Sequence, residues 1–251
     1  MIPSRRRTLG SGEGDGCCAH APADSRLQNG GKRICDLYDV KPSKFGQVDS
    51  YQSLAGDRMT RIFNGIDVNM SGRFGNDATL AGGIAFGNTL ADNCGIAVDS
   101  PQDLRFCRTA YGWSDDVQVK INGTYPLPWG LRTSYVFQSV PGFPILANYV
   151  VTSALAAPSL GRNFSAGASG TSDVALVEPN TAFDNRTNML DLRFSKRFRL
   201  RRTSITGNVD LSNVFNANTP QYLNTQYAPE WLNVTNALST RVVRLGVQIG
   251  F

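Results

Sequence analysis

The last eleven residues alternate strictly between apolar and polar side chains. Because side chains alternate between the two faces of a strand, the segment predicts a strand with one apolar and one polar face. Transmembrane β-barrels use such strands, of about 10 residues, with aromatic side chains at the bilayer boundaries. A C-terminal strand of a soluble β-sandwich gives the same pattern, so the segment by itself leaves both folds open. The apolar positions are Val243, Leu245, Val247, Ile249 and Phe251, and the polar positions are Arg244, Gly246, Gln248 and Gly250.

The same alternation recurs along most of the chain, and it predicts antiparallel strands. Including the terminal segment, about seven strands result, each near the length that a tilted membrane strand requires. The predicted strands cover 61–74, 79–90, 116–125, 131–139, 190–198, 205–215 and 241–251.

The connections between these strands alternate between short and long. Short turns are predicted at 75–78, 126–130 and 199–203, and long connections at 91–112, 152–184 and 216–240. An up-and-down barrel with short periplasmic turns and long external loops has this asymmetry, whereas a soluble Greek-key sandwich has no reason to sort loop length by end.

Seven strands are too few to close a small barrel, which needs about eight. We therefore expect an all-β fold: an open antiparallel up-and-down meander that forms an incomplete transmembrane β-barrel with long external loops. Its free edges are expected at 61–74 and at 241–251.

Composition narrows the class of protein. The chain has 251 residues, 41% of them hydrophobic, and no apolar run long enough for a membrane-spanning helix. Its net charge of +5 comes from clusters at 5–7 and 196–202 and not from a stripe interleaved with aromatic residues, which argues against nucleic-acid binding. No apolar signal segment follows Met1. An outer-membrane protein needs such a segment, so either the membrane interpretation is wrong or the chain is a fragment. We expect a fragment, with residues 1–16 unassigned, either disordered or a misassigned start, and residues 17–251 belonging to the barrel.

The five cysteines all fall outside the predicted strands. Zinc ligation is disfavoured, because no Cys-x-x-Cys spacing exists and His20 is the only histidine. Pairs that close short loops suit an oxidising compartment. We predict the disulfides Cys18–Cys35 and Cys94–Cys107, with one cysteine left over; whether it is Cys17 or Cys18 that pairs stays open.

Two further sets of residues follow from the parity of the strands. Charged residues on the polar side are expected to face the barrel lumen and, as a set, to contact the plug or a passing substrate. For any one of them the alternative is that it only forms ion pairs and binds water. These residues are Asp67, Arg73, Asp116, Lys120, Arg132, Asp191, Arg193, Arg197, Asp210 and Arg244. Aromatic residues near the short turns are expected to form an interface girdle that anchors the barrel: Tyr125, Trp129, Phe198 and Phe251.

No catalytic constellation is present in the sequence. A Ser-His-Asp or Cys-His site would have to use His20, and a plain loop histidine is the better interpretation. The segment Gly30–Arg33 lacks the Ser/Thr and the preceding glycine of a phosphate-binding loop. We therefore expect no enzyme activity, no cofactor and no metal.

Several segments resemble one family. The closest similarity is to TonB-dependent outer-membrane receptors of the Oar-like group, large receptors with an N-terminal carboxypeptidase-regulatory-like domain. The similarity extends from about Cys18 to Phe251, and its motifs are short but ordered. They are Cys35–Val40, Lys44–Val48, Phe63–Asp67, Asp92–Cys94, Tyr125–Trp129, Pro158–Asn163, Asn213–Pro220, Tyr227–Trp231 and Arg241–Phe251.

The resemblance implies a bacterial outer-membrane location and a part in ligand uptake. It also implies partners: outer-membrane lipid, the plug and missing strands of the receptor, TonB through the missing N-terminal part, and the barrel-assembly machinery. The family is similar to plugged barrels of about 22 strands, of which this chain supplies about a third, so it is not expected to transport by itself. A soluble or secreted β-rich binding or adhesion module is the alternative, and the transported substrate is not encoded in any motif.

Overall fold

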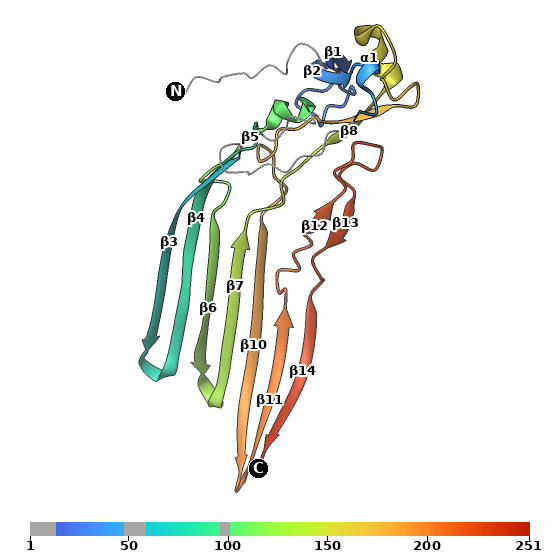
Figure 1. Ribbon diagram of the computed structural model, residues 1–251. Helices are drawn as coiled ribbons and strands as arrows, with labels where there is room; N and C mark the ends of the chain where they lie inside the picture. The colour runs from blue at the N-terminus through green and yellow to red at the C-terminus, as the bar shows by residue number, and fades with distance from the viewer. Residues whose placement is uncertain (1–13, 48–58, 96–100) are drawn as a thin grey trace.

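The computed structural model describes residues 14–47, 59–95 and 101–251. Its largest element is an eight-stranded antiparallel sheet in which seven strands follow the order β14-β11-β10-β7-β6-β4-β3 and β5 pairs with β4 (Figure 1). The strands are β3 (Thr60–Phe74), β4 (Ala78–Asp92), β5 (Arg108–Tyr111), β6 (Gln118–Leu127), β7 (Leu131–Val140), β10 (Thr187–Leu200), β11 (Thr203–Ser212) and β14 (Val242–Gly250).

The predicted meander is confirmed. Each of the six neighbouring pairs along the path is antiparallel, and β3 and β14 are the two end strands. The sheet is open, and the all-β class is correct at that level. Several strand bounds differ from the prediction by one to three residues. Among them, β6 begins at Gln118, β10 extends beyond 190–198 at both ends, and β11 ends at Ser212, so Phe215 lies beyond its strand.

All short turns lie at one end of the sheet, together with the C-terminus (Figure 1). The β3–β4 turn contains the 3-10 helix η2 (Gly75–Asp77), the β6–β7 turn contains η4 (Pro128–Gly130), and β10 and β11 are joined directly by Arg201 and Arg202. In η4, Trp129 and Gly130 have φ of 61° and 71°. These left-handed values reverse the chain within three residues.

The long connections lie at the opposite end, and they contain secondary structure that the sequence analysis did not predict (Figure 1). Smaller elements there are β1 (Gly14–His20), β2 (Arg33–Val40), η1 (Pro42–Lys44), η3 (Pro101–Phe106), β8 (Asn148–Thr152), α1 (Ser153–Leu160), β9 (Thr171–Ala175), β12 (Pro220–Leu223) and β13 (Val234–Ala237). The strands pair as three antiparallel hairpins, β1–β2, β8–β9 and β12–β13. The first strand begins at Gly14, upstream of the boundary that was expected between residues 16 and 17.

The buried apolar core lies among these smaller elements and not in the large sheet. We call this unit the cap. It consists of β1, β2, β8, α1 and β9, the loops inside these hairpins, the residues directly next to β8 and β9, and the segment Tyr227–Trp231. Its core brings together three stretches that are far apart in the sequence. The core residues are Cys17, Ala19, Ala21, Leu27, Ile34, Leu37, Ala147, Val151, Ala156, Phe164, Val174, Leu176, Val177 and Trp231.

Polar contacts fasten α1 and the segment after it to the first hairpin. The Ser159 hydroxyl donates to the Cys18 carbonyl at 2.8 Å and accepts from the Cys18 N–H at 2.7 Å. The Arg162 guanidinium pairs with Asp15 at 2.7 Å and also with Asp39. No helix in the described residues is long and apolar enough to cross a bilayer.

Candidate functional site

The register of the sheet places most of the predicted lumen residues on one face. Residues paired across antiparallel strands project to the same side. Starting at Arg73, successive pairings reach Arg193, Asp210 and Arg244 at the other edge. This row crosses all seven strands as Arg73, Thr79, Thr124, Ser134, Arg193, Asp210 and Arg244.

Five more of the predicted residues share this side, which we call the polar face. Their strand parities match that row, so the same alternation places them there: Asp67, Lys120, Arg132, Asp191 and Arg197. Asp116 does not belong with them, and its assignment to a strand position is wrong. It lies in a turn before β6, because the chain reverses through an Asp115 N–H to Gly112 carbonyl bond of 3.1 Å before the strand begins. Its carboxylate accepts from the Gln118 amide at 3.2 Å.

Charge is unevenly distributed along the polar face. Arg193 and Asp210 form an ion pair, with Nη2 and Oδ2 2.9 Å apart. In the same row, Thr79 and Thr124 share a hydroxyl hydrogen bond of 2.8 Å. The row and the positions between it and the short turns hold six arginines and one acid: Arg73, Arg132, Arg193, Arg197, Arg199, Arg244 and Asp210. Because arginines outnumber acids, this end of the polar face is a basic surface. The exposed Arg193–Asp210 pair contributes little to stability.

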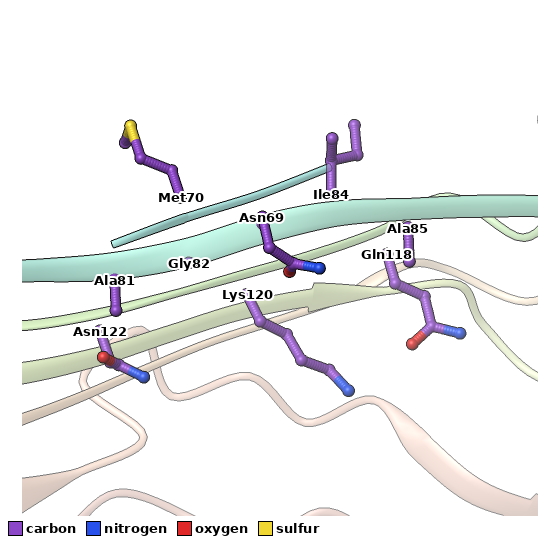
Figure 2. A pocket seen from close by; sticks show the side chains of 10 residues that line it. Asn69, Met70, Ala81, Gly82, Ile84, Ala85, Gln118, Lys120 and Asn122 are labelled. Atoms are coloured by element: carbon purple, nitrogen blue, oxygen red, sulfur yellow. The ribbon is translucent and has the colours of Figure 1, made fainter. Parts of the chain in front are cut away.

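A shallow hollow of about 330 Å³ lies over β3, β4 and β6. Small residues of β4 leave this space open. At Gly83, for example, a Cβ would lie only 2.3 Å from the Asn69 amide oxygen, so a larger side chain would displace Asn69. Figure 2 shows the separation of the faces at this point, with Asn69, Gln118 and Lys120 on one side of the strands and Met70 and Ile84 on the other. The hollow presents amides and an ammonium, which suits hydrogen bonding to a polar partner.

The other side of the sheet, which we call the apolar face, is exposed. Leu245 and Val247 of β14 keep 80% and 72% of their surface, and Met70 of β3 keeps 62%. None of the buried residues in the core cluster lies in the seven strands of the path. A soluble monomer rarely exposes a continuous apolar patch of more than a few hundred Å². Exposed apolar side chains gathered on one face are typical of surfaces that contact a membrane or another protein.

The predicted girdle residues lie at the short-turn end and are exposed. Trp129, at 84%, is in η4, and Phe251, fully exposed, directly follows β14. Tyr125 and Phe198, at 56% and 49%, lie near the ends of β6 and β10 on the apolar face. Their position at a lipid boundary remains a prediction.

The structure contains the two predicted disulfides. Cys18–Cys35 links β1 to β2 within the cap, and Cys94–Cys107 closes the connection between β4 and β5. Cys17 is the free cysteine and is buried. Burial raises the pKa of its thiol, and the negative charge of Asp39 adds to this. Three of the five cysteines lie in strands β1 and β2, which the sequence analysis missed.

A polar network at the edge of the cap was not predicted from the sequence. Asp24 accepts from the Arg26 guanidinium, with 2.7 Å between Nη2 and Oδ2, and from the Tyr227 hydroxyl at 3.0 Å. These hydrogen bonds hold the pKa of the Asp24 carboxyl well below its usual range. Arg26 also lies over the Trp231 ring, at 4.9 Å from its centroid. The sequence signal was weak, because Asp24 and Tyr227 are 203 residues apart.

The described residues offer two extended surfaces for binding, the polar and the apolar face of the sheet. Within the described ranges, no three His, Cys, Asp or Glu side chains cluster closely enough to hold a metal ion. Comparisons with protein-family models, with curated proteins and with solved structures gave no significant match. The two faces of the sheet and the cap are therefore the features that bear on function.

Proposed function

We propose that this chain is the C-terminal part of a TonB-dependent receptor barrel in the bacterial outer membrane. The resemblance of the short motifs supports this proposal. The observation that carries it is the exposed apolar face of a long, open, antiparallel sheet whose polar side chains are segregated on the other face. Outward-facing apolar side chains and inward-facing polar ones are the pattern of a transmembrane β-barrel.

The strand lengths suit a bilayer. The ten-residue strands β6, β7 and β11 would each rise about 33 Å and, with a tilt of about 45°, span about 23 Å, close to an apolar band of about 25 Å. The cap then lies at one boundary and the exposed aromatics at the other. In this orientation the cap and both disulfides are external, where ligands arrive.

The topology specifies what the missing wall must provide. The path has seven strands with alternating directions, so β3 and β14 run in the same direction. If two copies of this chain lay side by side with their caps at the same end, β14 of one copy would meet β3 of the other. The two strands would run parallel, whereas every pair along the path is antiparallel. Closure by antiparallel pairs alone requires an odd number of additional strands. We propose that the rest of the receptor supplies them, with the plug and the segment that contacts TonB.

In such a receptor, this chain would contribute part of the wall, part of the external ligand surface and the terminal strand. TonB would act through the N-terminal part, and the barrel-assembly machinery would recognise β14 and Phe251. The polar face would contact the plug or a passing ligand.

A matched pair of arginine substitutions in β14 tests the membrane assignment. Leu245 lies on the apolar face and Gln248 on the polar face of the same strand. An arginine facing lipid near the bilayer centre costs about 2–4 kcal/mol, and one facing the lumen costs little. Leu245→Arg should therefore sharply reduce the fraction of protein that floats with phosphatidylcholine vesicles after refolding, and Gln248→Arg should leave it unchanged.

The soluble binding or adhesion module is the competing proposal. It predicts a monodisperse protein in buffer without detergent, no flotation with vesicles, and improved solubility for Leu245→Arg. That combination of results would refute the membrane assignment.

A further inference from the structure

The apolar face contains a second hollow, of about 420 Å³, over β10, β11 and β14. Gly207 forms its floor, and a Cβ placed there would meet no atom within 4 Å. Apolar side chains that share the outward parity line it: Leu131, Phe194, Val209, Leu245 and Val247. The hollow is therefore a groove open to whatever covers the apolar face.

Lys196 lies at the side of this groove, paired in register with Gly207 on one side and Leu131 on the other. It is unusual on this face. At the outward-facing positions of the seven strands, the other charged residue is Asp92, which ends β4 and is paired with Arg108 at 2.5 Å. None of the ion pairs between described residues involves Lys196.

The Lys196 side chain extends toward the short-turn end of the sheet. Its ammonium lies 5.3 Å from the centroid of the Phe198 ring, two residues closer to the β10–β11 turn. That turn contains the exposed Arg201 and Arg202. A lysine near a bilayer boundary keeps its stem along apolar surface and its charge at the level of the headgroups. The groove thus has an apolar body and a cationic end.

We infer that this groove binds an anionic phospholipid, with an acyl chain along Gly207 and the headgroup phosphate on Lys196. The inference rests on the proposed membrane position of the sheet. The Lys196 ammonium beside an uncovered apolar groove complements a phosphate that is attached to a hydrocarbon chain. A protein segment could replace the lipid only by placing an anionic group on Lys196 and an apolar side chain in the groove. The short-turn end places this lipid in the periplasmic leaflet.

Quenching of Trp129 by brominated lipids tests the site. Trp129 lies two residues before Leu131, Trp231 is buried in the cap, and Trp113→Phe removes the other exposed indole. In vesicles, brominated phosphatidylglycerol should associate about five-fold more strongly than brominated phosphatidylcholine, the preference that one lysine near an anionic headgroup provides. Lys196→Gln should remove most of this preference, and Lys196→Arg should retain it.

Two further variants distinguish binding in the groove from a general attraction between the basic side chains of this end and anionic lipid. Gly207→Leu fills the groove without changing charge and should also reduce the preference. Arg132→Gln removes an exposed cation from the polar face near the same turns and should leave it unchanged. If the preference survives both Lys196→Gln and Gly207→Leu, the inference is wrong and the attraction belongs to the Arg201–Arg202 turn.

The outcomes also distinguish this inference from the proposed function. Equal quenching by the two lipids would overturn the phospholipid site while supporting a membrane position for the sheet. No quenching by either lipid would show that the short-turn end does not reach the bilayer, and it would overturn both proposals.

Discussion

Replacing Trp231 by alanine should unfold the cap locally and leave the sheet intact. The indole is 2% exposed within the cap core, and its N–H donates to the Leu146 carbonyl at 2.8 Å. Removing a buried tryptophan side chain costs about 3–5 kcal/mol, and the unpaired Leu146 carbonyl is part of that loss. We expect the free energy of cap unfolding to fall by about 4 kcal/mol.

The loss of Trp231 should also destabilise β8, because the backbone of residues 225–227 is hydrogen-bonded to Asn148 of that strand. The Asn148 N–H donates to the Thr225 carbonyl at 2.8 Å, and the Tyr227 N–H donates to the Asn148 carbonyl at 2.7 Å. Hydrogen exchange measured by mass spectrometry, in detergent micelles, reads this coupling directly. Peptides from β8 and β9 should lose about three orders of magnitude of protection, since 1.4 kcal/mol is a factor of about ten.

Trp129→Ala provides the matched control. Trp129 is 84% exposed in the β6–β7 turn, and its removal should change cap protection by less than about 0.5 kcal/mol. Equal effects of the two variants, or loss of protection in β10 and β11 with Trp231→Ala, would refute the argument that the cap is a separate cooperative unit with its own core.

Three other predictions concern single side chains. In a receptor that ends with this chain, Phe251→Ala should lower the amount of assembled barrel and leave the ligand affinity of the assembled fraction unchanged; normal assembly with reduced affinity would instead place Phe251 in a binding site. The depressed pKa of Asp24 means that its stabilising effect is complete above its unfolded-state pKa of about 3.9 and is lost as the pH falls below that value; cap unfolding followed from pH 7 downward should show this loss in the native protein and not in Asp24→Asn. Cys17, buried and with a raised pKa, should resist iodoacetamide until denaturant unfolds the cap; rapid labelling of the native protein would contradict its burial.

The large sheet could be predicted because its determinants are local. Alternation from Val243 to Ile249 specifies two faces without knowledge of the neighbouring strand. The short turns predict three of the six neighbouring pairs, β3–β4, β6–β7 and β10–β11, and the observed pairing adds the three that long connections join. The same logic gave the polar face and the exposed aromatics at the short-turn end. It failed at Asp116, where the turn through Asp115 displaced the start of β6.

The cap was decided by tertiary contacts. Its strands are short. The apolar residues of β8 and β9 pack against a hairpin more than a hundred residues earlier and against Trp231, about sixty to eighty residues later. No pattern within one window of sequence specifies such a core, because each stretch contributes only part of it. The groove at Gly207 has the same origin: a glycine in a strand shows where space exists, and only the register shows that Lys196 lies beside that space.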